Sequence, residues 1–307
     1  MFPVQLTGHD SHELLPRLEH APARGLFLDA QHQGDLVEGQ PLLGAQQQYG
    51  RDSDVWRWDG RVDGGRWMNV FNVNGSVDFL PSNDNMVHLV AEKRTQNGRE
   101  PDDIHYEVVQ AGGNVTICAI WNNNSRCEDG GIDSFRNRGN NENHSSVKFT
   151  VRVPRTVRVG AHSVNGGVSV RDVGAEVHAN TVNGGVTVRN TSGPVRANTV
   201  NGGVDVNTSI GPVSAETVNG NVDARMSTLQ GDDDMDFKTV NGSVSIYVPA
   251  SFDGRFRFDT VHGGIDSDFP MTISGKWGPR HASGTIGNGT RDIRASSVNG
   301  SIELLRQ

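Results

Sequence analysis

The sequence contains little of what a thick globular core requires. Only 34% of its 307 residues are hydrophobic and only 6% are aromatic, while glycine alone accounts for 38 residues. This composition does not suit a core of packed helices, because small side chains bury little apolar area. It suits a thin, repetitive β-structure in which small side chains stack and turns recur.

The sequence also lacks long apolar runs and an excess of basic residues. No segment approaches the roughly 20 consecutive apolar residues of a membrane-spanning helix, so we expect no transmembrane segment. The formal net charge is −8, whereas nucleic-acid-binding domains are normally basic. We therefore expect no nucleic-acid partner.

Cysteine is almost absent, and the only two cysteines lie close together. Cys118 and Cys127 flank an Asn-rich stretch in CAIWNNNSRC. Such a pair indicates a local disulfide formed in an oxidising compartment, and the alternative is two unrelated reduced thiols. A zinc site would need two more soft ligands, which no nearby His or Cys spacing supplies, so we expect no metal.

The first part of the chain shows neither periodicity nor a complete signal peptide. No basic region follows Met1, yet residues 41–50, PLLGAQQQYG, resemble the end of a signal peptide, with an apolar pair followed by small residues. We expect residues 1–45 to be a disordered or mis-started leader with a signal-peptide remnant.

A Val-Asn-Gly tripeptide dominates the rest of the chain. It begins at Val164 and Val182, an interval of 18 residues (182 − 164), and recurs at Val200, Val218, Val240 and Val298, with Val-His-Gly at Val261. Residues 281–289, HASGTIGNG, fall in the longest gap and are interpreted as a degenerate unit. An isolated earlier copy, NVNGSV, covers Asn72 to Val77. A fixed period of this kind indicates a repeat architecture.

Each unit contains two short alternating segments separated by turn residues, as in VTVRNTSGPVRANTVNGGV from Val186 to Val204. Two strands and two tight turns make one coil, or rung, of an all-β solenoid. A meander of antiparallel hairpins is the competing interpretation, because Asn-Gly is also a strong hairpin signal. The fixed register favours the β-solenoid, since identical residues then stack from rung to rung.

Residues in corresponding positions define three predicted columns at the turn. Parity places Val195, Ala197, Thr199 and Asn201 inside the coil and Val200 outside. The repeat asparagines should form an internal ladder, and the glycines should supply positive φ angles in the turn. This turn ladder comprises Asn165, Asn183, Asn201, Asn219, Asn241, His262 and Asn299 with Gly166, Gly184, Gly202, Gly220, Gly242, Gly263 and Gly300. The outward valines should form an apolar stripe, covered at a corner or available for binding: Val164, Val182, Val200, Val218, Val240, Val261 and Val298.

The segment before the array is rich in predicted strands but lacks its period. We divide the chain into the leader, a β-rich N-terminal cap with the first wide coils at 46–159, and the Val-Asn-Gly solenoid at 160–307. The end units of a solenoid must be atypical, because an uncapped end exposes an open sheet edge.

The combined motifs resemble the bacterial putative-adhesin family of β-strand repeats, also called the toastrack domain. The resemblance rests on WDGRV, NVNGSV, the CAIW…C loop, VKFTVRVP, the serial TVNGGV units and the terminal SSVNGSIEL, and it covers about residues 55–307. It implies a single-stranded right-handed β-helix, export, and an extracellular, cell-surface or periplasmic location. It brings no catalytic residues and no cofactor.

Catalysis by a β-helix would require carboxylates that converge from neighbouring rungs. Asp205, Asp223 and Asp266 occupy one outward column, with Ser245 between the last two. The next column is mixed: Arg171, Arg189, Asn207, Arg225, Tyr247 and Asp268. Such columns more often form a solvated sheet face, so we expect no enzymatic activity. The acidic loop Asp232–Asp236 would need help from another loop to bind Ca²⁺.

The sequence therefore predicts a secreted or envelope β-solenoid that binds a glycan, a surface or an envelope protein. An envelope-stress or assembly scaffold, acting through protein contacts, is the alternative. A carbohydrate-active enzyme is less favoured. Self-association through the solenoid ends or edges stays open.

Overall fold

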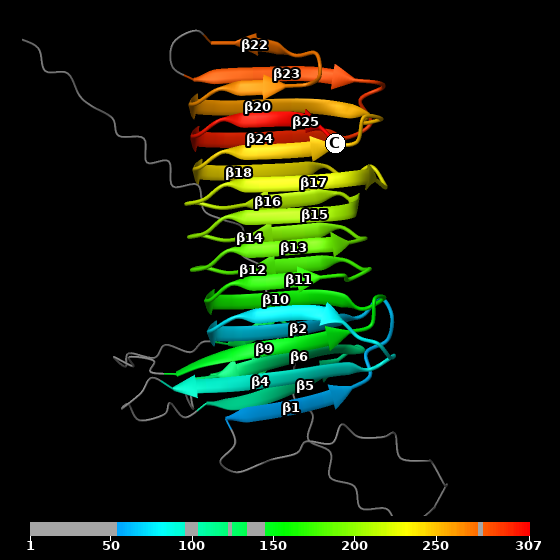
Figure 1. The fold of residues 1–307 in the computed structure, drawn as a ribbon, viewed down its shortest axis with the longest axis vertical. Coiled ribbons are helices and arrows are strands. Elements are labelled where there is room, and N and C mark those ends of the chain that lie inside the picture. Colours follow the sequence, from blue (N-terminus) through cyan, green and yellow to red (C-terminus); the bar gives the residue numbers. More distant parts are fainter. Residues whose placement is uncertain (1–53, 96–103, 122–124, 134–144, 276–278) are drawn as a thin grey trace, which may run out of the picture. The chain divides into compact units, whose positions relative to one another are not determined.

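The computed structural model describes residues 54–95, 104–121, 125–133, 145–275 and 279–307 (Figure 1). The chain divides into Met1–Gly44 and Ala45–Gln307, and all described residues belong to the second unit. The expected leader at 1–45 lies outside the described residues. In the described segments no helix is long and apolar enough to cross a membrane.

The described residues fold into two long β-sheets and one small sheet (Figure 1). Sheet A contains, in spatial order, β1 (Val55–Gly60), β4 (Val87–Thr95), β9 (Ser145–Val153), β3 (Val77–Pro81), β11 (Val168–Arg171), β13 (Val186–Thr191), β15 (Val204–Gly211), β17 (Val222–Leu229), β19 (Val244–Val248), β25 (Ile302–Arg306) and β21 (Ile265–Ser267). Sheet B contains β22 (Thr272–Ser274), β23 (Arg280–Ile286), β20 (Gly254–His262), β24 (Asp292–Asn299), β18 (Met235–Asn241), β16 (Val213–Glu216), β14 (Val195–Asn198), β12 (Val177–Asn180), β10 (Arg158–Asn165), β2 (Trp67–Asn74), β6 (Asn114–Ile120) and β5 (His105–Ala111). The small sheet pairs β7 (Arg126–Glu128) with β8 (Gly131–Asp133).

Each repeat contributes one strand to each sheet, and equivalent residues pair in parallel. Val186 of β13 pairs with Val204 of β15, which pairs in turn with Val222 of β17. In sheet B, Ala179 pairs with Ala197 across β12 and β14. This parallel register confirms the β-solenoid and excludes antiparallel hairpins for the repeat array.

The core between the two sheets is narrow because the inward residues are small. Ala197 and Val206 are fully buried, and the inward side chains of both sheets belong to one hydrophobic cluster. A buried valine contributes about 1.5–3 kcal/mol relative to an exposed one. Larger inward residues occur towards the ends of the array, where Phe79 and Phe258 are also fully buried.

The early copy NVNGSV is a full member of the stack. Strand β2 pairs in parallel with β10, so Asn74 lies beside Asn165, and β3 pairs with β11. The first Val-Asn-Gly rung is therefore continuous with the array, although 91 positions (165 − 74) separate the two asparagines. The interval is filled by strands on the other side of β2 and β3, including β6 and β9.

The other end of the solenoid also departs from chain order. The final segment, β24 and β25, lies between the rung of β18 and β19 and the rung of β20 and β21 (Figure 1). Residues 281–289 are not the missing rung, so that prediction is wrong. Most of them belong to β23, which pairs antiparallel with β20 and is followed outward by β22. The repeat period therefore predicts the rungs themselves, but not the order in which they stack in space.

Antiparallel strands end three of the four sheet edges. In the described residues, β1 ends sheet A and β5 ends sheet B at the N-terminal end, while β22 ends sheet B at the other. Only the three-residue strand β21 ends sheet A there. A very short strand limits the row of unpaired backbone groups that could recruit another chain.

The two cysteines form the predicted disulfide. Cys118 on β6 and Cys127 on β7 are bonded, with a Cα–Cα distance of 5.7 Å. The bridge is buried with Ile120 in a small apolar cluster, against which Phe71 packs. It therefore fixes the β7–β8 hairpin to sheet B.

Candidate functional site

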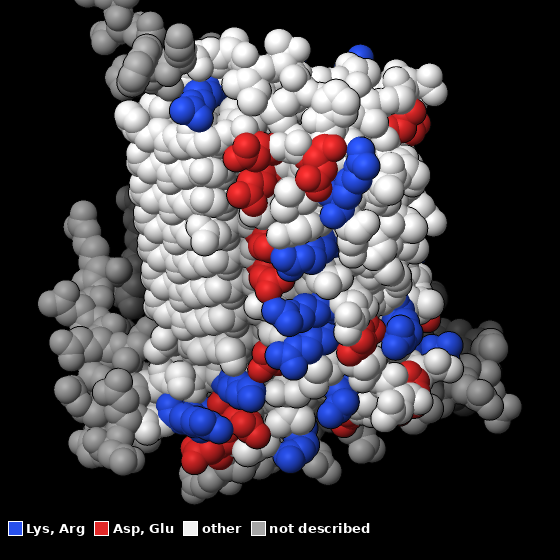
Figure 2. Space-filling model, turned by 45° about the horizontal axis from the view of Figure 1, so that its top comes forward, with Lys and Arg blue, Asp and Glu red and all other residues white. Residues whose placement is uncertain are grey.

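The most regular surface lies where the chain turns from sheet B into sheet A. We call this turn, with the repeated sequence Val-Asn-Gly, the repeat corner. It connects β12 to β13, β14 to β15 and β16 to β17 (Figure 1). In Figure 2 the uncharged columns at the left form this corner, and the charged side chains gather beside it over the outer face of sheet A.

The repeat asparagines form a hydrogen-bonded ladder along the corner. Five amide bonds of 2.8 Å run from each Asn Nδ2 to the Oδ1 of the preceding rung, joining Asn165, Asn183, Asn201, Asn219, Asn241 and Asn299. His262 continues the column, because it pairs with Asn299 in the β20–β24 register. Stacked side chains of this kind hold successive turns in one geometry.

The prediction that this ladder is internal is wrong. Val195, Ala197 and Thr199 are buried as parity requires, but Asn201 is exposed. Strict alternation ends at Thr199, because the chain turns there and strand parity no longer applies. The asparagine ladder is therefore a surface feature.

A buried threonine column fixes the corner from inside. The Oγ1 of Thr199 donates to the carbonyl of Gly184 at 2.8 Å, and Thr217 makes the same bond to Gly202. Each bond joins one rung to the glycine of the preceding rung and satisfies a buried hydroxyl. The signal was present in the sequence, because Thr or Ser precedes every Val-Asn-Gly of the array. The column comprises Ser163, Thr181, Thr199, Thr217, Thr239, Thr260 and Ser297.

The corner glycines are needed because the backbones of neighbouring rungs approach closely. A Cβ on Gly202 would lie 2.1 Å from the carbonyl oxygen of Gly184, and one on Gly220 would lie 2.1 Å from that of Gly202. The φ angle of Gly202 is 159°, at the edge of the range that L side chains rarely adopt, whereas Gly220 in the next rung shows no such angle. The close approach of neighbouring backbones is therefore the constraint that these corner glycines share.

The outward valines form an evenly exposed apolar column. Their exposed fractions lie between 37% and 40%, the column being Val164, Val182, Val200, Val218, Val240, Val298 and Val261 in spatial order. The core valines, by contrast, are almost completely buried. We call this column the valine stripe. It runs beside the asparagine ladder, so the corner alternates methyl and amide groups.

The outer face of sheet A carries the acidic column, and two of its carboxylates, those of Asp205 and Asp223, are paired with arginines. Asp205 and Asp223 are register neighbours, as predicted. Asp205 accepts a bond from Arg189 at 2.6 Å, and Asp223 forms an ion pair with Arg225 at 2.9 Å. Burial raises the pKa of Asp223, while the charge of Arg225 lowers it. Both carboxylates are therefore held in ion pairs on this face.

The C-terminal rung interrupts both predicted outward columns. Glu303 lies between Ser245 and Asp266, and Leu305 follows Tyr247. Asp268 is therefore not the next neighbour of Tyr247, contrary to the sequence prediction. Its side chain instead accepts a bond from the backbone N–H of Arg306.

Two carboxylates of the acidic stretch Asp232–Asp236 are bound by protein groups. Asp234 accepts the backbone N–H of Asp292 at 3.0 Å and pairs with Arg294 at 3.4 Å, and Asp236 pairs with Lys238 at 2.5 Å. Among the described residues, no group of three or more His, Cys, Asp or Glu side chains is arranged to hold a metal ion.

A second polar column crosses the outer face of sheet B. The Nδ2 of Asn198 donates to Asn180 at 2.8 Å, and that of Asn180 contacts His162 Nδ1 at 3.2 Å. The His162 ring stacks on Phe71, with a centroid distance of 4.2 Å. Burial lowers the pKa of His162 to about 4, so the imidazole is neutral and its Nδ1 accepts the amide proton near pH 7.

Comparison with known families finds one family model that covers the valine stripe. The family model described as Toastrack DUF4097 matches residues 108–305, which include every residue of the valine stripe. The chain belongs to this family. The match confirms the resemblance drawn from the TVNGGV units and the terminal SSVNGSIEL. The Toastrack model does not reach β1, β2 or β3, which complete the array at its N-terminal end.

Solved structures add only distant likenesses to the Toastrack match. A putative cell adhesion protein from Clostridium sporogenes ATCC 15579 is 8% identical, with a TM-score of 0.35, over 82% of this chain and 100% of that one. A putative adhesin from Bacteroides fragilis NCTC 9343 is 13% identical, with a TM-score of 0.40, over 81% of this chain and 96% of that one. No curated protein matches the sequence.

Proposed function

We propose that this Toastrack protein is a non-enzymatic binding protein of the cell surface or envelope, whose binding surface is the repeat corner. The observation that carries the proposal is the valine stripe, in which seven stacked rungs expose a valine by 37–40%. A contiguous apolar surface of this extent usually marks an interaction site. An isolated exposed valine would need no such explanation.

The chemistry of the corner favours an extended, uncharged ligand. Each internal amide of the asparagine ladder donates one bond and accepts one along the column. An Asn amide has two N–H donors and two acceptor lone pairs, so one donor and one acceptor per rung stay available to a ligand. Methyl groups beside amides match the apolar faces and hydroxyl edges of sugars. We therefore propose a neutral, linear glycan as the ligand.

The proposal includes export and a right-handed coil with rungs of about 18 residues. The Cys118–Cys127 disulfide supports an oxidising compartment, because such bonds are rare in the cytosol. Equivalent residues 18 positions apart, such as Asn183 and Asn201, are directly bridged. Crossovers between parallel strands of one sheet are overwhelmingly right-handed.

The test compares the wild-type protein with a corner variant on insoluble cellulose, chitin and starch. The variant V182T/V200T/V218T replaces three exposed methyls by hydroxyls and keeps β-branched side chains. If the ligand covers these methyls, each change costs about 0.8 kcal/mol, or roughly 2 kcal/mol together. The control T187A/N207A alters the outer face of sheet A and should bind like wild type.

The same incubation separates binding from catalysis. We expect retention of the protein on at least one neutral polysaccharide, without new reducing ends in the supernatant. Reducing ends that increase with time would contradict the non-enzymatic proposal. Binding to none of the polysaccharides would contradict the glycan ligand, and capture of an envelope protein that depends on the three valines would favour the scaffold alternative.

A further inference from the structure

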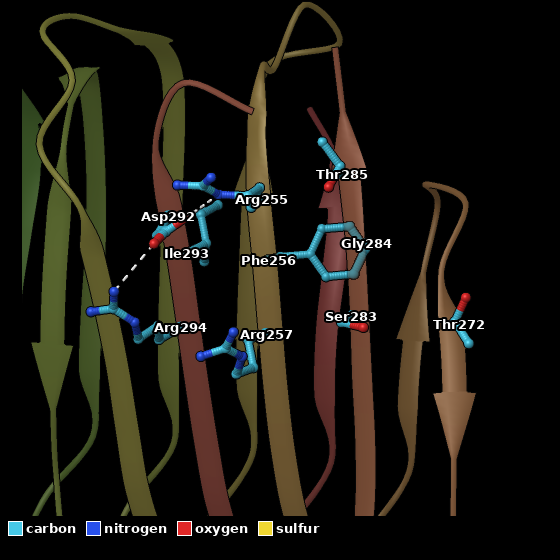
Figure 3. A pocket seen from close by; sticks show the side chains of 10 residues that line it. All are labelled: Arg255, Phe256, Arg257, Thr272, Ser283, Gly284, Thr285, Asp292, Ile293 and Arg294. Atoms are coloured by element: carbon cyan, nitrogen blue, oxygen red, sulfur yellow. Dashed lines mark hydrogen bonds and ion pairs between the residues drawn. The ribbon is translucent and has the colours of Figure 1, made fainter. Parts of the chain in front are cut away.

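A polar groove lies near the C-terminal end of sheet B, away from the repeat corner. It encloses about 450 Å³ and is lined by side chains of β20, β22, β23 and β24 (Figure 3). Its charged lining comprises Arg255 and Arg257 from β20 with Asp292 and Arg294 from β24. Figure 3 places these four side chains on one side and the hydroxyl-bearing residues on the other.

The groove carries more positive charge than its carboxylates balance. Asp292 pairs with Arg255 at 2.7 Å and with Arg294 at 3.2 Å, and Asp234 contacts Arg294 at 3.4 Å. The bond from Arg255 lowers the pKa of Asp292, which is therefore ionised near pH 7. Three guanidinium groups thus face two carboxylates.

Arg257 is the unbalanced group. Among the described residues no carboxylate lies within ion-pair distance of it. Its register partner on β24 is Arg294, so two cations occupy adjacent positions on neighbouring strands. Like charges in such positions destabilise a sheet. Arg257 differs from other unpaired arginines because it lies in a groove beside a second guanidinium, so positive charge gathers there.

The opposite wall of the groove is neutral and hydroxylated. Arg257 pairs in register with Ser283 on β23, which pairs with Thr272 on β22, so the three lie in one line across the sheet. The base of the groove is closed, because Phe256 is only 2% exposed. Gly284 makes this packing possible, since a Cβ there would lie 2.3 Å from Phe256 Cζ.

We propose that this groove binds the acidic group of a charged saccharide. The planar guanidinium of Arg257 is suited to bidentate contact with a carboxylate or sulfate. The sugar hydroxyls then face Ser283 and Thr272 on the far wall. This site is independent of the repeat corner, which carries no charge and serves a different ligand.

Calorimetric titration of the full chain tests the site with three probes: oligogalacturonate, sulfated dextran and neutral dextran. The variant Arg257→Gln removes the uncompensated charge, and Arg196→Gln is the matched control, an exposed arginine on β14 of the same sheet. We expect wild type to bind at least one acidic probe. Arg257→Gln should bind that probe with roughly tenfold or more lower affinity, because it loses a hydrogen bond between charged groups. Arg196→Gln should bind it like wild type.

The outcomes distinguish the chemistry of the acidic group. Binding of oligogalacturonate alone assigns the site to a carboxylate, and binding of sulfated dextran alone assigns it to a sulfate ester. Equal losses in both variants would mean general attraction to arginine and overturn the proposal, as would unchanged affinity in Arg257→Gln. Lack of binding to either acidic probe would also overturn it. The valine variants of the corner should bind these probes like wild type, so the two proposals fail separately.

Discussion

The side-chain amide of Asn299 donates a hydrogen bond to Asn241 at 2.8 Å, although 58 residues separate them in the chain. This bond places the last Val-Asn-Gly rung between the rung of β18 and β19 and that of β20 and β21. The C-terminal segment is thus an internal layer of the stack. Strands β20 and β21 pair with β24 and β25, so this segment joins them to the array.

The first prediction follows from that internal position. Leu304 on β25 is fully buried, while its neighbour Leu305 is only partly buried on the outer face. Leu304→Ala should lower the free energy of unfolding by about 2–5 kcal/mol, because it leaves a cavity between packed rungs. Leu305→Ala is the control and should cost less. Urea denaturation measures both, and equal small losses would place β25 outside the core.

The second prediction concerns the corner glycines. Gly220→Ala should lower the free energy of unfolding by roughly 1–3 kcal/mol, because the new Cβ would meet the carbonyl of Gly202 at 2.1 Å. Gly203→Ser is the matched control, since the nearest atom to its Cβ is 3.4 Å away and Ser243 occupies the equivalent position. It should remain within about 0.5 kcal/mol of wild type. Thermal unfolding that ranks the two variants in the opposite order would refute the close-approach explanation.

The third prediction uses the lowered pKa of His162. This pKa is about 4 in the folded chain, against a usual value of 6.5, because burial disfavours the imidazolium. Protons therefore bind the unfolded state first as the pH falls. The stability contributed by the neutral ring is present above pH 6.5 and declines between pH 6.5 and about 4, by roughly 3 kcal/mol.

The variant His162→Asn isolates this effect. It removes the titrating group and keeps a partner for the amide of Asn180. Urea unfolding at pH 7.5, 5.5 and 4.5 should show a smaller loss of stability with acid in the variant than in wild type. Other ionisable groups contribute alike to both proteins. Parallel curves would mean that His162 titrates normally.

The fourth prediction concerns the disulfide between Cys118 and Cys127. Its loop is short, with a sequence separation of 9, and the chain-entropy estimate for such a loop is about 3 kcal/mol. Reduction should lower the melting temperature of wild type and leave C118S/C127S unaffected. The intact mass of exported protein should show no free thiol. Two free thiols in that material would contradict the oxidising compartment.

The 18-residue period was sufficient to predict the stacked strands, the asparagine ladder and the exposed valines. These features depend on local alternation and on identical residues meeting in register, both of which can be read from Val186 to Val204. The two cysteines, nine positions apart, also predicted the local disulfide. The family followed from the combination of motifs, and its match is now established.

Other features depend on long-range pairing that no local pattern records. Asn299 lies beside Asn241 because β18 pairs with β24, and 58 residues separate the two asparagines in the chain. The exposure of Asn201 depends on the angle of the turn, where parity ends. No sequence pattern distinguished Arg257 from the other arginines. Its groove forms only because β24 pairs with β20, and because the antiparallel strands β23 and β22 continue the sheet on the other side of β20.

Valine-methyl NMR provides the most direct test of the repeat corner as a binding surface. Labelled protein would be titrated with cellohexaose and chitohexaose, and the methyl shifts of exposed and buried valines compared. The account predicts concentration-dependent shifts at Val182, Val200 and Val218, with little change at the fully buried Val188 and Val206. Shifts confined to other surfaces, or no shifts with either oligosaccharide, would contradict it.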